Sequence, residues 1–77
     1  MPDRKTEELH LIQARVHVAI AKACIARQCA IIARLQALGV NTERAEVALR
    51  TMQNTLRTMT AHMQLIEEAV RKDGEAR

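Results

Sequence analysis

Aromatic residues are absent from this sequence: none of its 77 residues is Phe, Tyr or Trp, although 48% of them are apolar. The apolar volume comes from Ala, Ile, Leu, Val and Met, most of which are strong helix formers. Only two glycines and one proline break the chain, so we expect few and long helices. A chain this short is marginally stable by itself and usually needs a metal, disulfides or a partner.

The sequence also lacks a long uncharged apolar run. No stretch of about 18 residues is free of charge, so we expect no membrane span. The first ten residues, MPDRKTEELH, are charged and lack the apolar core of a signal peptide, which predicts a cytoplasmic protein. Cys24 and Cys29 lie about 140° apart around a helix and cannot bridge to each other within it. We expect them to be reduced thiols, buried or half-buried.

Acidic residues are missing from the middle of the chain. Residues 9–38 and 47–66 contain bases but no Asp or Glu. These bases are typical of a solvated face, or alternatively of a strip that binds the phosphates of RNA or DNA. The strip would consist of Arg15, Lys22, Arg27, Arg34, Arg50 and Arg57. Its plan is similar to that of the repressor-of-primer proteins, small hairpin dimers that bind paired RNA loops, although no aromatic ring is present to stack on bases.

The segment LGVNTERAE, residues 38–46, predicts a sharp reversal of the chain. Gly39 can adopt the left-handed conformation that ends a helix. Asn41 and Thr42 are both good caps for a following helix. Such a short link places the two helices antiparallel and adjacent. The predicted single domain, residues 1–77, has a first helix at about 4–38, a turn at 39–42, a second helix at about 43–72 and a frayed end at 73–77.

Heptad spacing gives each predicted helix a continuous apolar stripe. Steps of three and four residues are typical of helices packed in a left-handed supercoil. In the second helix the stripe is Ala45, Leu49, Met52, Leu56, Met59, Met63, Ile66 and Val70. In the first it is Leu11, Ala14, Val18, Ala21, Ile25, Gln28, Ile32 and Leu35. The methionines favour a core position, with an adaptable docking groove as the alternative.

The first helix carries more apolar surface than one partner helix can cover. Its other apolar residues form one row of His10, His17, Cys24, Ile31 and Leu38, and a further run of Leu9, Val16, Ala23, Ala30 and Ala37 with Ile12, Ala19, Ala26 and Ala33. Leaving that surface in water would forfeit roughly 25 cal/mol per Å². We therefore predict an all-α, two-helix antiparallel hairpin that dimerises into a four-helix bundle, because two-fold dimers are the commonest assembly. A larger assembly or a different protein partner is the alternative.

The predicted oligomer interface follows the two stripes. Its residues are Leu11, Val18, Ile25, Gln28, Ile32, Leu35, Leu49, Met52, Leu56, Met59, Met63 and Ile66. Gln28 is the one polar member. It is either a solvated residue or a buried amide that fixes the register by pairing with its symmetry mate or with Thr51.

Two histidines are the candidates for metal binding. In an antiparallel hairpin, facing residues have numbers that sum to about 80, so His17 and His62 lie at one level. Two copies would bring four imidazoles together, which is enough to hold a metal ion. The ordinary alternative is a pair of partly buried histidines, and His10 is expected at the surface. No catalytic set of residues is recognisable, so we expect neither an enzyme nor a cofactor.

The stretch from His17 to Ile66 resembles a group of small alphaproteobacterial proteins of unknown function. The pattern of that group falls here on His17, Ile25, Gln28, Ile32, Leu35, Gly39, Thr42, Ala45, Glu46, Thr55, Leu56, Met59 and His62. Asn41 stands where the group often has Asp, which preserves a capping side chain. The resemblance implies a helical hairpin and implies no activity.

Overall fold

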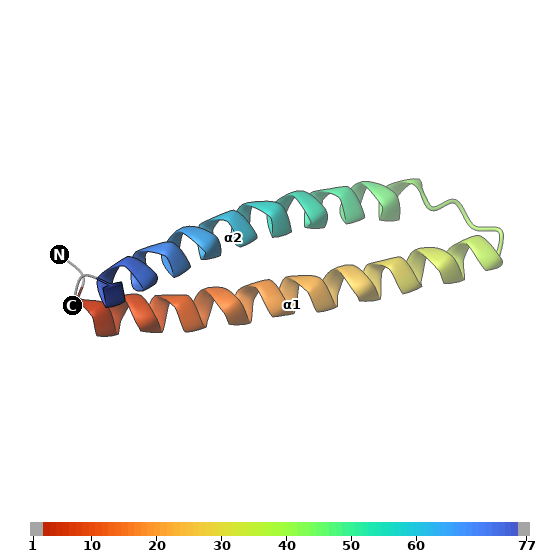
Figure 1. Cartoon of the computed structure of the whole chain (residues 1–77). Helices are drawn as coiled ribbons and strands as arrows, with labels where there is room; N and C mark the ends of the chain where they lie inside the picture. Colours follow the sequence, from red (N-terminus) through yellow and green to blue (C-terminus); the bar gives the residue numbers. More distant parts are fainter. Residues whose placement is uncertain (1–2, 76–77) are drawn as a thin grey trace.

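The computed structural model describes residues 3–75 and contains two long helices that lie side by side as a hairpin (Figure 1). α1 spans Arg4–Ala37 and α2 spans Glu43–Glu75. The molecule extends over 60 × 17 × 14 Å, so it is a rod two helices wide. The prediction of an all-α antiparallel hairpin is confirmed.

α1 begins at a capping aspartate. The Asp3 side chain accepts a hydrogen bond from the Thr6 backbone N–H at 2.8 Å. This bond satisfies one of the donors that a helix start leaves free, and it lowers the pKa of Asp3. Glu7, in the first turn, places a further negative charge near the positive end of the helix dipole.

The reversal uses the glycine that the sequence predicts. Gly39 has a φ of +71°, a left-handed conformation. The Val40 N–H donates to the Leu35 carbonyl at 2.9 Å, and the Gly39 N–H donates to the Gln36 carbonyl at 3.0 Å. Together these two bonds form a Schellman motif, which satisfies the last carbonyl groups of α1. The helix therefore ends within one residue of its predicted end.

α2 begins with help from Asn41 and ends later than predicted. The Glu43 N–H donates to the Asn41 Oδ1 at 2.8 Å, which caps the new helix. At the other end the helix continues for three residues past the predicted end at 72. Arg71 contacts Glu75 at 2.7 Å, and this pair supports the final turn. The predicted fraying of residues 76–77 falls outside the described residues.

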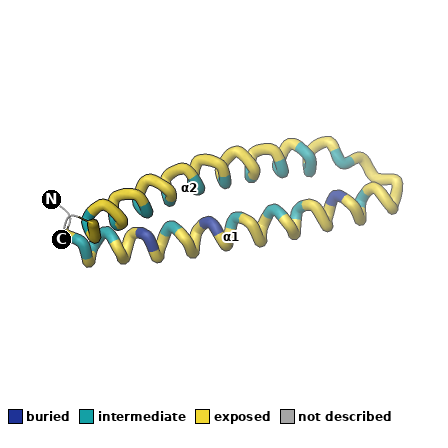
Figure 2. Tube along the Cα trace, in the orientation of Figure 1, coloured by how far each residue is buried: buried dark blue, intermediate teal, exposed yellow. Residues whose placement is uncertain are grey.

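The two apolar stripes face each other inside the hairpin (Figure 2). On α1, Leu11, Val18 and Ile32 are buried, with exposed fractions of 5–8%, and the remaining stripe residues are half-buried. On α2 every residue of the stripe is half-buried and none is buried. One hairpin thus forms a continuous core but leaves its α2 side partly open to water.

Candidate functional site

The twelve residues predicted for an oligomer interface lie in the contact between α1 and α2 of a single chain. Gln28, the polar member, is half-buried, and its Nε2 donates to the Ala45 carbonyl at 2.9 Å. Its amide therefore bonds to the backbone of α2. Thr51, the other partner considered, is exposed and donates instead to the Val47 carbonyl within its own helix.

One side of the hairpin is polar. Arg15 Nη2 lies 3.3 Å from Glu67 Oε2, which links α1 to α2 across this side. Lys22 lies one heptad further along the same row of α1 and is exposed. A charged side chain loses hydration when it is buried, so this side favours contact with water.

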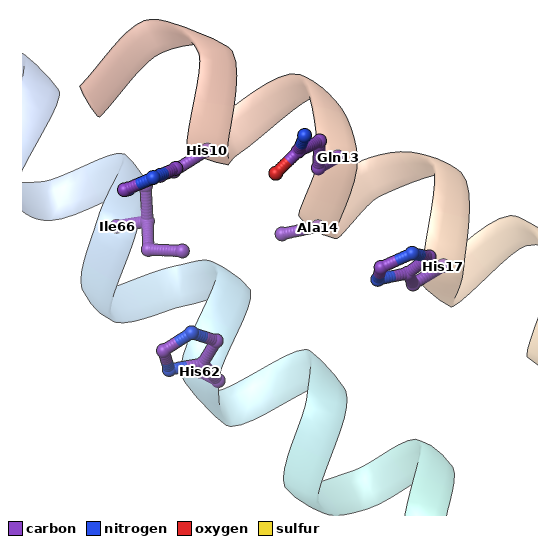
Figure 3. Close-up of a pocket in the computed structure, with 6 residues that line it drawn as sticks. All are labelled: His10, Gln13, Ala14, His17, His62 and Ile66. Carbon is purple, nitrogen blue, oxygen red and sulfur yellow. The ribbon is translucent and has the colours of Figure 1, made fainter. Parts of the chain in front are cut away.

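The opposite side contains the histidines. His10 and His17 project from α1 and His62 from α2 around one pocket of about 370 Å³, which Gln13, Ala14 and Ile66 also line (Figure 3). The structure thus brings His17 and His62 to one level, as the sum of about 80 predicts, and adds His10. All three histidines are exposed.

The histidine pocket lacks the ligands of a metal site within one chain. In residues 3–75, no group of three or more His, Cys, Asp or Glu side chains is arranged to hold a metal ion. A site shared between copies stays a prediction. It would need the pocket sides of two hairpins to face each other.

The six bases of the predicted nucleic-acid strip are all exposed but lie in separate rows. Arg27 follows Lys22 by five residues, which is about 140° around the helix. Arg15 and Lys22 therefore lie on one flank of α1, and Arg27 and Arg34 on another. Arg50 and Arg57 lie on α2, where Arg57 donates to Asn54. These positions divide the positive charge instead of concentrating it.

The outer face of α1 carries a second apolar stripe with the same heptad spacing as the first. It points away from α2, and every member is exposed. We call it the outer stripe; its residues are Leu9, Ile12, Val16, Ala19, Ala23, Ala26, Ala30, Ala33 and Ala37. Half or more of the surface of Leu9, Ile12 and Val16 is exposed, and Ile20 beside them is 56% exposed. A surface helix normally carries one apolar stripe, so the outer stripe is a second one that α2 does not cover.

The expected absence of a membrane span stays a prediction, and the composition of α1 bears on it. α1 contains an 18-residue window with a mean hydropathy of 1.5, of which 11% is buried, and its length and composition suit a membrane span. The expectation depended on the absence of a run free of charge, whereas this window contains no more than two charged residues. The core helix of a soluble protein can meet the same criterion.

The cysteines also differ from expectation. Cys24 and Cys29 are free, as expected, but both are exposed. Cys24 lies beside a hollow of about 150 Å³ on the pocket side, next to Ala21 and Met52. Cys24 was assigned to an apolar row that one partner helix does not reach, whereas Cys29 follows Arg15 and Lys22 in heptad spacing.

A pair of acids at the open end of the hairpin was not singled out from the sequence. Glu7 of α1 and Asp73 of α2 interact, and the hydrogen bond with Asp73, partial burial and the charge of Asp73 raise the pKa of Glu7. While both carboxyl groups are ionised, the buried Glu7 Oε2 has no hydrogen-bond donor among the described residues; the hydrogen bond with Asp73 needs a proton on one of the two groups. The sequence does contain a signal for this pair, because facing residues of the hairpin have numbers that sum to about 80, and 7 and 73 sum to 80.

Comparison with known protein families, with curated proteins and with solved structures finds no match to this chain. The resemblance to the alphaproteobacterial group stays a prediction.

Proposed function

We propose that this chain is a non-catalytic interaction module that works as a self-associated pair of helical hairpins, in a protein-binding or small regulatory role in the cytoplasm. The exposed area of one chain carries the proposal. The hairpin exposes 6003 Å², whereas a compact protein of 8.7 kDa exposes about 4,700 Å². The excess of about 1,300 Å² is more than the roughly 800 Å² that each partner buries in a standard interface.

The chemistry of the exposed surface supports the same proposal. α1 has apolar residues on its inner stripe, its outer stripe and part of its pocket side, while the outer positions of α2 are largely polar. Contiguous apolar patches of this kind mark interaction sites in soluble proteins. A second hairpin that covers α1 gives a four-helix assembly in which the two α1 helices lie inside.

Charge substitutions on the two outer faces test this proposal. Ala23→Glu places a carboxylate in the middle of the outer stripe, where a second copy would bury it. We therefore expect the Kd of the dimer to rise at least tenfold. Ala61→Glu is the matched control, because Ala61 is an exposed alanine in α2 and should leave the mass unchanged. Size-exclusion chromatography with light scattering compares them. Equal masses for the two variants would contradict self-association through α1.

The two alternatives predict different observations. Binding of a paired RNA loop would depend on the six bases and would weaken steeply as salt concentration rises. A metal held by His17 and His62 of two copies would copurify and appear in elemental analysis. Self-association predicts the same dimer in the absence of RNA and of metal.

A further inference from the structure

We propose that the outer stripes of two copies pair antiparallel about a two-fold axis near residues 24 and 25 of α1. This inference depends on the proposed self-association and specifies its interface and register. The occupant of the outer stripe is then a second copy of this chain. The surface excess described above is larger than the roughly 800 Å² that each partner buries in a standard interface.

The size gradient along the outer stripe favours the antiparallel direction. Its N-terminal part contains Leu9, Ile12 and Val16, while the rest consists only of alanines. In an antiparallel pair whose facing numbers sum to 49, Ile12 meets Ala37 of the second copy and Val16 meets Ala33. Ile12 and Val16 then each face a methyl group, which keeps the distance between the helices uniform along the contact and fills the space between them. Leu9, whose facing number is 40, lies beyond the paired stretch of α1.

A parallel pair would lack this fit. Ile12 would face Ile12 and Val16 would face Val16 at one end, whereas alanines would face alanines at the other. Two straight helices cannot be far apart at one end and close at the other without losing contacts. In a parallel supercoil, Lys22 would also lie opposite Arg27 of the second copy on both flanks, which places like charges together.

The charged flanks favour one antiparallel register. The sum of 49 applies to facing residues of the outer stripe itself. On one flank of the stripe, this register places Lys22 opposite Cys29 and Arg15 opposite Gln36 of the second copy. On the other flank it places Gln13 opposite Arg34 and Ile20 opposite Arg27. Each of these four bases thus meets a neutral residue. The exposed Arg27 stem can cover Ile20, which is 56% exposed in a single chain.

Neighbouring registers are worse by the same criterion. A shift by one heptad toward the N-terminus brings Lys22 opposite Lys22 at the two-fold axis. A shift by one heptad in the other direction brings Arg27 opposite Arg27. The shift toward the N-terminus keeps eight stripe residues in contact, as the proposed register does, whereas the other shift leaves six. Charge repulsion therefore decides between the first two and favours the register centred between residues 24 and 25.

Engineered cysteines test the direction and the register together. In a Cys24→Ser, Cys29→Ser background, Ala19→Cys and Ala30→Cys should form a disulfide between copies, because the two positions face each other in the proposed pair. They cannot bridge within one chain, since eleven residues of helix separate them by about 16 Å. We expect a covalent dimer with two links between residues 19 and 30, identified by mass spectrometry of the peptides.

The single-cysteine variants are the controls. Ala19→Cys alone and Ala30→Cys alone should stay uncrosslinked, because like residues lie about 16 Å apart along the antiparallel pair. Links from 19 to 19 and from 30 to 30 would overturn the proposal in favour of a parallel pair. A dimer in sedimentation without any link would overturn this interface while leaving self-association intact, and a folded monomer would overturn both.

The unmodified residues of the chain provide a second measurement if the cysteine substitutions prevent folding. A short amine-to-thiol crosslinker applied to a mixture of ¹⁴N- and ¹⁵N-labelled chains should join Lys22 of one copy to Cys29 of the other, giving peptides of mixed isotope content. Absence of the mixed peptides from a sample that sediments as a dimer would overturn the register.

Discussion

Gln28 joins the two helices at the scale of one residue. Its Nε2 donates to the Ala45 carbonyl at 2.9 Å, and a carbonyl within an α-helix already accepts a bond from the residue four positions on. Loss of the amide therefore leaves that carbonyl partly satisfied, whereas a carboxylate at the same place would repel it.

The first prediction compares two replacements of Gln28. Gln28→Glu should lower the free energy of unfolding by about 1–3 kcal/mol, because it places a half-buried charge against an acceptor. Gln28→Met keeps the length of the side chain and should stay within about 1 kcal/mol of the wild type. Urea denaturation followed by circular dichroism measures both. Equal losses in the two variants would show that the amide contact does not determine the effect.

The acid pair of Glu7 and Asp73 gives a prediction about pH. The pKa of Glu7 is raised in the folded state, first by its hydrogen bond with Asp73 and then by burial and by the charge of Asp73. Stability from this group is therefore complete below its ordinary value of 4.5 and is lost as the pH rises through the higher folded pKa.

We accordingly expect Glu7→Gln to raise the melting temperature at pH 7 and to change it little at pH 4. Glu8→Gln is the matched control, because Glu8 lies 3.2 Å from Arg4 and its neutralisation removes a favourable pair instead of a repulsive one. Thermal denaturation at the two pH values gives the comparison. A gain from Glu7→Gln that persists unchanged at pH 4 would contradict the assigned repulsion.

At the scale of the elements, the two glycines have opposite roles. Gly39 has a φ of +71°, and no atom lies within 4 Å of where a Cβ would be, so its requirement is conformational. Gly74 is inside α2, and a Cβ there would lie 3.5 Å from Arg4 Nη2, an ordinary contact.

Replacement of each glycine by alanine should therefore shift stability in opposite directions. Gly39→Ala should cost about 1–2 kcal/mol, because a Cβ strains the left-handed conformation. Gly74→Ala should stabilise by up to about 1 kcal/mol through helix propensity. Chemical denaturation of the two variants measures both shifts. A loss of stability in both would contradict the helical assignment of Gly74.

Local signals explain which elements were predictable from the sequence. The end of α1 follows from Gly39 and the start of α2 from the cap at Asn41, because both depend on a few adjacent residues. The inner stripes follow from heptad spacing, and their burial in the structure matches it. The end of α2 was placed too early because the last residues of a chain were expected to fray, whereas the contact between Arg71 and Glu75 lies within the final turn.

Candidate site residues were harder to predict because a helix has several faces and the sequence does not state which ones meet a partner. Cys24 follows an apolar row and yet is exposed, since α2 covers only one stripe of α1. The predicted basic strip divides for the same geometric reason: Lys22 and Arg27 lie on different flanks. His17 and His62 were paired correctly because the sum of facing residue numbers depends only on the position of the turn.

At the scale of the whole molecule, the composition of α1 suits two environments, a membrane and an interface with a second copy of the chain. Its apolar window suits a membrane span by length and composition, and its outer stripe also fits a second copy of itself. The proposed self-association assigns the outer stripe to a protein interface, because α1 already uses one stripe to pack against α2 and carries exposed bases on both flanks of the other.

Sedimentation equilibrium of the unmodified chain in aqueous buffer at micromolar concentrations tests the central claim most directly. We predict a mass of about twice 8.7 kDa, with a melting temperature that rises with protein concentration because association stabilises the fold. A mass of 8.7 kDa for a chain that remains helical, with a melting temperature independent of concentration, would contradict it.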